Sequence, residues 1–153
     1  MAQPHPSPSR LSAWRAFLGA HAAVIETLDS ELRSTHSLPL TWYDVLVQLS
    51  EADGRLRMSE LANAVLLTGY NCTRLVDRMV TAGLVDRRPD PDDARVRWAV
   101  LTESGHNLLH CAAPTHMQGI QRLFAGIVED DAEADRLTAR FTAMGDAARQ
   151  PPP

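Results

Sequence analysis

Residues 83–102 read GLVDRRPDPDDARVRWAVLT, and their composition predicts a β-hairpin. Residues 84–88 and 96–101 are rich in β-branched, apolar and arginine side chains, as in strands with one solvated face. Residues 89–95, between them, hold two prolines and three aspartates, which favour a turn. The sequence therefore predicts two antiparallel strands joined by a rigid, charged loop.

Two short helices are predicted immediately before this hairpin. Ser59 is the expected N-cap of a helix that runs to about Leu66, and a further helix is expected from Thr68 to Gly83, where the glycine suits a C-cap. An earlier helix is expected to start at a Thr41 cap and to stop at residues 53–54. Two short helices followed by a hairpin are the pattern of a winged helix-turn-helix, here over residues 41–102, whose second helix enters the major groove of DNA.

Long amphipathic helices are predicted on both sides of this segment. Apolar residues recur at spacings of three and four from Trp14 to Leu32, and a second set lies between residues 103 and 149. The expected fold is mostly α (α+β): one domain over residues 11–149, with dimerisation helices over 11–33 and 103–149. Residues 1–10 and 150–153 are expected to be tails, the first of them disordered.

Composition excludes several classes of protein. The chain has 153 residues, of which 44% are hydrophobic and 22% charged, and no apolar run approaches the roughly 20 residues of a membrane span. The Pro-rich start lacks the apolar core of a secretory signal, and two cysteines are too few for a disulfide framework. These features predict a cytoplasmic protein with free thiols and no membrane partner.

The positive charges are unevenly distributed, although the net charge is −4. Every basic residue is arginine, and six of the arginines fall between Arg74 and Arg97. On the predicted reading helix, exposed side chains of types that address base edges or phosphates are expected to contact DNA. These candidates are Thr68, Tyr70, Asn71, Thr73 and Arg74, with Arg78 reaching the DNA backbone.

The hairpin is expected to contact DNA in a different way. Arg95 lies near its tip, where a rigid turn can insert one guanidinium into a narrow minor groove. Asp93 is expected to support Arg95 through hydrogen bonds or an ion pair. Arg87, Arg88 and Arg97 are the predicted phosphate contacts along the strands.

With these motifs the sequence resembles the MarR family of regulators over nearly its whole length. The matching segments are MSELA (58–62), TRLVDRM (73–79), GLV (83–85), DAR (93–95) and LTESG (101–105). The resemblance implies a sequence-specific homodimeric regulator, expected to be a repressor, that binds a pseudo-palindromic double-stranded operator. It also implies release from DNA by a small aromatic or anionic effector that binds between the dimerisation helices and the DNA-binding lobe.

A finer resemblance is to the urate-responsive subgroup of that family. It rests on AWR (13–15), YDVL (43–46) and TR (73–74). By this likeness Trp14 would stack on the ligand, Asp44 would accept hydrogen bonds from its ring nitrogens, and Arg74 would couple the pocket to DNA. The alternative is that Trp14 belongs to the dimer core and Asp44 is a helix-surface or ion-pair residue.

Single residues point to other functions. Cys72 lies near a helix start and could sense oxidation, although its spacing to core residues favours a buried thiol. His106 and His110 share one helix face, but no further ligand completes a metal site, so neither a metal nor another cofactor is expected. No catalytic motif is present, so the chain is not expected to be an enzyme. A winged-helix module used only for protein association is the remaining alternative.

Overall fold

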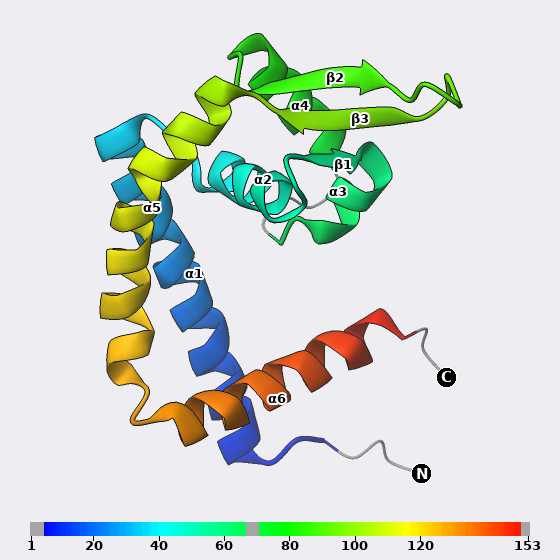
Figure 1. Cartoon of the computed structure of the whole chain (residues 1–153). Helices are drawn as coiled ribbons and strands as arrows, with labels where there is room; N and C mark the ends of the chain where they lie inside the picture. Colours follow the sequence, from blue (N-terminus) through cyan, green and yellow to red (C-terminus); the bar gives the residue numbers. More distant parts are fainter. Residues whose placement is uncertain (1–4, 67–70, 151–153) are drawn as a thin grey trace. The chain divides into compact units, whose positions relative to one another are not determined.

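The computed structural model describes residues 5–66 and 71–150, and it divides the chain into two compact units, residues 1–116 and 117–153. The first unit opens with helix α1, Pro8–His36 (Figure 1). The hydroxyl of Ser7 accepts a hydrogen bond from the N–H of Arg10 and caps the helix. The prediction of a tail over residues 1–10 is therefore wrong for residues 8–10, because a serine cap and a proline in the first turn start the helix earlier.

Helix α2, Leu40–Glu51, begins without a side-chain hydrogen bond from its N-cap residue. Pro39 occupies the N-cap position, so the predicted Thr41 cap is wrong. The Oδ1 atom of Asp29, on α1, accepts the N–H of Leu40 at 2.8 Å. The first turn of α2 thus obtains its acceptor from the preceding helix. The helix ends before Asp53 and Gly54, both with positive φ, as predicted.

The helix-turn-helix follows directly. Strand β1 covers Arg55–Arg57, helix α3 covers Met58–Ala64 and helix α4 covers Cys72–Thr81. Arg57, and not Ser59, occupies the N-cap position of α3, and this helix ends two residues before Leu66. Helix α4 begins at Cys72 rather than at Thr68, which lies outside the described residues.

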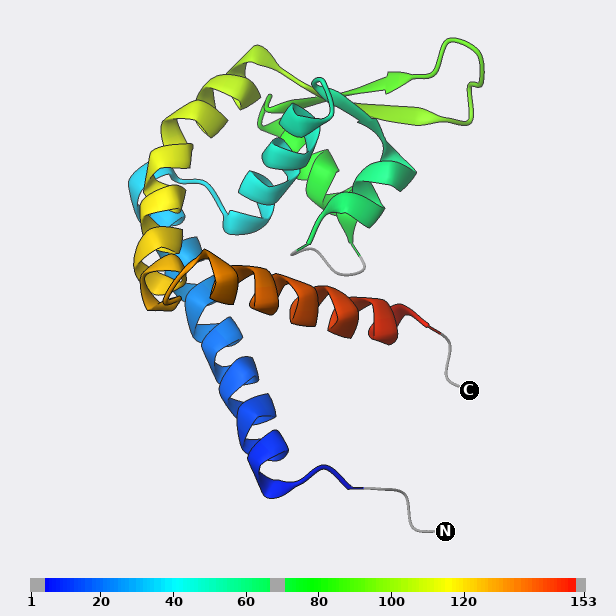
Figure 2. The same cartoon turned by 60° about the horizontal axis from the view of Figure 1, so that its bottom comes forward.

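A three-stranded antiparallel sheet closes this unit. Strands β2, Val85–Pro89, and β3, Arg97–Leu101, form the predicted hairpin, and the strand order is β1-β3-β2. Their register runs from Val85 opposite Leu101 to Pro89 opposite Arg97. The edge position of β2 tolerates the proline. In Figures 1 and 2 the hairpin extends beyond the helices of this unit, so its loop is available to a partner.

The core of the first unit joins helices to the inner face of the sheet. Its large, fully buried side chains come from α1, α2, α3, α4, β2 and the α1–α2 link: Leu32, Leu38, Val45, Leu46, Leu49, Leu61, Val76, Met79 and Val85. Truncating a buried leucine of this kind to alanine typically costs about 2–5 kcal/mol. This core therefore fixes α4 against the strands of the wing.

Helix α5, Glu103–Leu123, leaves the sheet through a hydrogen-bonded corner and continues through Pro114. The Oγ1 atom of Thr102 accepts the N–H of Gly105 at 3.0 Å, which confirms Thr102 as its cap, and donates to the carbonyl of Gly83 at 2.7 Å.

The second unit contains the last turns of α5, the short 3₁₀ helix η1, Ala125–Ile127, and helix α6, Asp131–Arg149. Asp130 caps α6 through its Oδ1 atom, which accepts the N–H of Glu133 at 2.7 Å. Phe141 and Met144 on α6 remain exposed. The predicted fold class, mostly helical with a small antiparallel sheet, is confirmed.

Candidate nucleic-acid interface

Helix α4 has a sharply divided surface. Cys72, Leu75, Val76 and Met79 are buried at helical spacing, as the core of the first unit requires. The opposite face carries exposed polar and charged side chains: Thr73, Arg74, Asp77 and Arg78. Because the apolar face is occupied by the core, this polar face is the one that can meet DNA.

Asn71 lies just before this helix and not within it. It occupies the N-cap position, with φ −130° and ψ 35°, but its side chain makes no capping hydrogen bond. Its exposed amide is therefore left for an external partner, and it carries the donor and acceptor pair that can address an adenine edge. Tyr70 lies outside the described residues.

Asp90 organises the loop of the wing. Its Oδ1 atom accepts the N–H groups of Asp92, at 2.9 Å, and Asp93, at 3.2 Å, while Oδ2 accepts the indole N–H of Trp98 at 2.8 Å. The hydrogen bond from the Asp92 backbone, followed by that from Trp98, holds the pKa of the Asp90 carboxyl below its usual value. The sequence did not single out Asp90, although an aspartate within a Pro- and Asp-rich turn is typical of an Asx turn, in which its side chain accepts the backbone N–H two residues later.

Arg95 projects from the same loop. The Oδ1 atom of Asp93 accepts both its backbone N–H, at 3.0 Å, and its Nε–H, at 3.2 Å, and the two side chains form an ion pair. The Arg95 side chain is nevertheless 91% exposed. Asp93 holds the Nε edge of the guanidinium, while the rest of the group faces solvent, as insertion into a groove requires.

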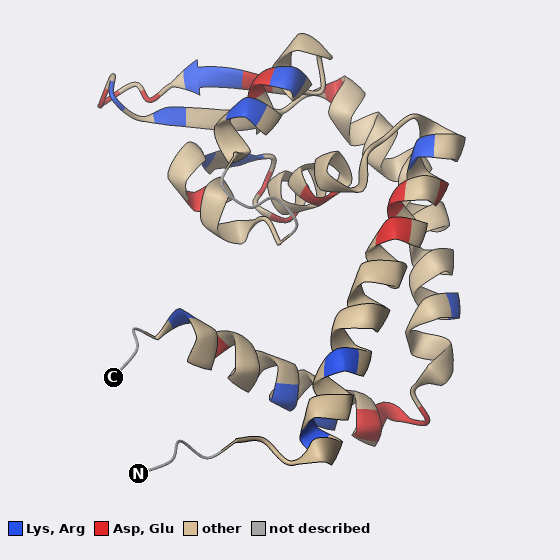
Figure 3. Ribbon diagram, turned by 180° about the vertical axis from the view of Figure 1, so that it is seen from behind, with Lys and Arg blue, Asp and Glu red and all other residues tan. Residues whose placement is uncertain are grey.

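The strand arginines are not equivalent. Arg87 pairs with Asp77 of α4 at 3.1 Å and is partly buried, so it ties the reading helix to β2. Arg88 pairs with Asp86 at 3.3 Å on the exposed side of the strand. The Nη1 atom of Arg97 donates to the carbonyl of Ala94 at 2.7 Å. Figure 3 shows basic residues on both strands of the hairpin and acidic ones in its loop.

The surroundings of Cys72 oppose ionisation of its thiol. The thiol is buried, which raises its pKa above the usual value, and the nearby charge of Arg87 opposes this with a smaller effect. A thiol with a raised pKa holds little of the reactive thiolate at neutral pH. The structure thus agrees with the buried alternative weighed for Cys72.

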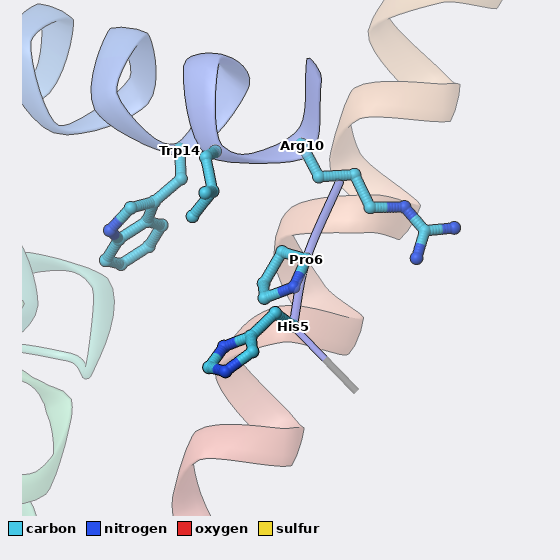
Figure 4. A pocket seen from close by; sticks show the side chains of 5 residues that line it. His5, Pro6, Arg10 and Trp14 are labelled. Carbon is cyan, nitrogen blue, oxygen red and sulfur yellow. The ribbon is translucent and has the colours of Figure 1, made fainter. Parts of the chain in front are cut away.

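Trp14, one of the three residues expected to bind an effector, lines a hollow at the start of α1. Trp14 is half exposed and lines a hollow with His5, Pro6, Arg10 and Leu11, but not with Asp44 or Arg74 (Figure 4). Arg74 lies on the exposed face of α4.

Asp44 is hydrogen-bonded to the chain just after the end of α3. It is 8% exposed, and its carboxylate accepts the N–H of Leu66 at 2.7 Å and the side-chain amide of Gln48 at 3.4 Å. A helix-surface Asp44 is therefore at odds with its burial, whereas a contact between Asp44 and a ligand stays a prediction. It anchors the chain that leaves α3 toward the reading helix.

The histidine pair on α5 does not amount to a metal site. The rings of His106 and His110 lie 4.4 Å apart between centroids, on an exposed face. Across residues 5–66 and 71–150, no group of three or more metal-binding side chains occurs. In the same ranges, no helix is long and apolar enough to cross a membrane.

A helix-turn-helix whose second helix presents a polar face beside a braced, arginine-bearing hairpin defines a winged-helix DNA-binding protein. Comparison with known proteins narrows this class. A model of the MarR family matches residues 36–96. The transcriptional regulator MhqR of Bacillus subtilis is 30% identical over 115 residues, covering 75% of this chain and 77% of MhqR.

Solved structures agree with this match. Sco3205, a MarR family transcriptional regulator from Streptomyces coelicolor crystallised in complex with DNA, is 26% identical, with a TM-score of 0.86 over 97% of this chain and 93% of its own. BpsR of Bordetella bronchiseptica, 19% identical, shares the fold with a TM-score of 0.73 over 88% of this chain and 98% of its own.

The chain belongs to the MarR family of transcriptional regulators. Its relatives are regulators and not enzymes, which confirms the prediction that it has no catalytic function.

Proposed function

We propose that this protein is a sequence-specific repressor that binds a pseudo-palindromic operator as a homodimer and is released by a small aromatic or anionic ligand. The observation that carries the proposal is the pairing of a polar α4 face with the hydrogen-bonded wing that presents Arg95. Asn71, Thr73 and Arg74 are the proposed base-edge or phosphate contacts, and Arg78 is a further contact to the backbone. Such a regulator works in the cytoplasm, where the operator lies.

The homodimer is supported by apolar side chains that the single chain leaves exposed. Leu11, Trp14 and Leu18 on α1 are 39–50% exposed, and Phe141 and Met144 on α6 are about as exposed. A second copy would bury such surfaces, and its two-fold symmetry would place half-sites about one DNA turn, roughly 34 Å, apart. Light scattering should then give twice the chain mass of 16.8 kDa.

A small effector is supported by the regulation of BpsR, whose DNA binding responds to 6-hydroxynicotinic acid. Two hollows of the first unit are candidates for such a ligand. One is the Trp14 hollow of about 630 Å³, where Figure 4 shows the indole and the His5 imidazole on one side and the Arg10 guanidinium extending away. The other, of about 240 Å³, lies between α2 and α5 and is lined by Tyr43, His110 and Ala113 among others.

Variants can separate the two effector sites. Trp14→Ala removes the ring that would stack on a ligand, while Ala113→Leu fills the hollow between α2 and α5. Urate and 6-hydroxynicotinic acid, titrated into the protein–operator complex, should release the wild type and fail to release one of these variants. Equal responses of the wild type and both variants would remove both sites from consideration.

The regulatory function is tested by selecting bound genomic fragments and measuring affinity for the best duplex and for a scrambled one as salt rises. The wild type should keep a preference of at least about 10³ for the selected duplex. Transcription from a promoter that carries this duplex should fall when the protein is present. A protein without any preference would be a winged-helix association module instead.

A further inference from the structure

A cavity of about 420 Å³ lies at the base of the wing, within the first unit. Its charged and polar lining comes from β1, the start of α3, β2, the wing loop and the start of β3: Arg57, Ser59, Arg87, Arg95 and Arg97. Met58 and Val96 complete the lining, and no acidic side chain contributes to it. A hollow of this composition attracts an anion with several hydrogen-bond acceptors.

Arg57 occupies an unusual position for its residue type. It is the N-cap of α3, where a side-chain oxygen normally accepts a helix N–H, and a guanidinium has no acceptor to offer. Glu60 satisfies the backbone instead, since its carboxylate accepts the N–H of Arg57 at 2.9 Å. The Arg57 side chain is thus free of any capping role.

The same guanidinium is held in place by an aromatic ring. The Arg57 Cζ atom lies 5.3 Å from the centroid of the Trp98 ring, and that of Arg55 lies 5.0 Å from it. The indole N–H of Trp98 donates to Asp90, the residue that organises the wing loop. Stacking on a fixed ring lowers the rotamer freedom that Arg57 would lose on binding, so the group is preorganised.

The cavity carries an excess of positive charge. Of its four arginines, Arg87 pairs with Asp77 and Arg95 with Asp93. Across the part of the chain that the structure describes, Arg57 and Arg97 form no ion pair within 4 Å. Neither guanidinium therefore has a carboxylate in direct contact, although the charge of Arg57 is near enough to Asp90 to help lower the pKa of that carboxyl.

We propose that this cavity binds a phosphate of the operator backbone. Arg57 and Arg97 are the charged ligands, the Ser59 hydroxyl is an additional donor, and Trp98 is a positioning residue for Arg57. This inference rests on the proposed function, because the phosphate belongs to the DNA that α4 reads. A phosphate contact fixes the register of the protein on the duplex and carries no base information.

The test compares Arg57→Gln with the matched control Arg55→Gln. Both remove one arginine from β1 and from the Trp98 ring, but only Arg57 lines the cavity. The slope of log Kd against log salt should become shallower by about 0.9 per phosphate contact, or about 1.8 for a dimer, in Arg57→Gln. The slope should stay near the wild-type value in Arg55→Gln and in Arg57→Lys, which keeps the charge.

Base preference is the second readout. Arg57→Gln should weaken binding to the selected duplex and to the scrambled duplex by the same factor, so their ratio is unchanged. Uncharged methylphosphonate placed at single phosphates should, at one position per half-site, weaken the wild type more than it weakens Arg57→Gln, in which only Arg97 and Ser59 still contact that phosphate.

Two results would overturn the phosphate site while leaving the proposed function intact: a wild-type salt slope in Arg57→Gln, or a lost preference for the selected duplex without a change in slope. If the wild type itself shows no preference, the proposed function fails instead. Circular dichroism and thermal melting of each variant establish that it is folded.

Discussion

Gly105, in the first turn of α5, permits a contact that no other residue would allow. A Cβ atom built on it would lie 2.2 Å from the carbonyl oxygen of Leu84 and 2.9 Å from the Cδ1 atom of Leu101. The Leu84 oxygen is a backbone atom that also accepts the N–H of Thr102 at 3.2 Å, so it cannot rotate away as a side chain can. In Gly105→Ala the backbone must therefore move by about 1 Å, judged from ordinary carbon–oxygen contact distances.

The expected loss can be estimated against a matched glycine. Overpacking of this kind costs about 1–3 kcal/mol, whereas Gly→Ala in an open helical position stabilises by about 0.5–1 kcal/mol. Gly19, on α1, has nothing within 4 Å of such a Cβ. Gly19→Ala should therefore raise the free energy of unfolding and Gly105→Ala should lower it.

Urea unfolding at a fixed protomer concentration measures both effects. With a slope of about 2 kcal/mol/M, the two midpoints should differ by roughly 1 M. The loss should be accompanied by weaker operator binding, because the strained corner positions the last strand of the wing. If Gly105→Ala unfolds at the same urea concentration as Gly19→Ala, the close approach at Leu84 does not constrain the fold.

Three further predictions concern the cap of α2, the DNA contacts and the thiol. Asp29→Ala should lower the free energy of unfolding by about 1 kcal/mol, because Leu40 loses its acceptor. Burial of Asp29 opposes ionisation, but hydrogen bonds from Arg33 and Leu40 outweigh it and hold its pKa below 3.8. The stability that Asp29 contributes is therefore present above about pH 4 and is lost as pH falls through the lowered pKa. If the difference in unfolding free energy between wild type and variant does not shrink in acid, this assignment is wrong. Arg95→Ala should weaken binding most on duplexes with a narrow minor groove, and Asn71→Ala should relax base preference; unchanged affinity and preference in both variants would refute the docking geometry. Under peroxide, Cys72→Ser and the wild type should dissociate from the operator at the same rate, because the buried thiol has a raised pKa. Dissociation of the wild type alone would restore the redox alternative.

The sequence predicted the order and type of elements well because these follow from local signals. Gly83 adopts φ +75° just after α4, and the Pro- and Asp-rich loop joins two strands in the register that their alternation allows. Helix starts were predicted less well. Thr41 was a plausible cap by residue type, but the acceptor for α2 comes from Asp29, eleven residues earlier, and no local pattern reveals such a contact.

The candidate site shows the same division. Asp93 beside Arg95 is a local pair, so adjacency in sequence sufficed to predict a contact between them. Asp44 is different: its hydrogen bond to Leu66 spans 22 residues and depends on how α2 packs against α3. Arg57 was missed because it precedes the helix-turn-helix, and its place near Trp98 arises only when β1 pairs with β3.

The ion pair between Arg87 and Asp77 has a consequence for signalling. It fastens the reading helix to a wing strand, and the buried face of α4 is fixed by the same core. The reading helix and the wing of one copy are therefore expected to move together as one rigid body. We therefore expect an effector to change the distance between the two copies and not the geometry within one copy. The two reading helices would then no longer match the spacing of the half-sites in the operator.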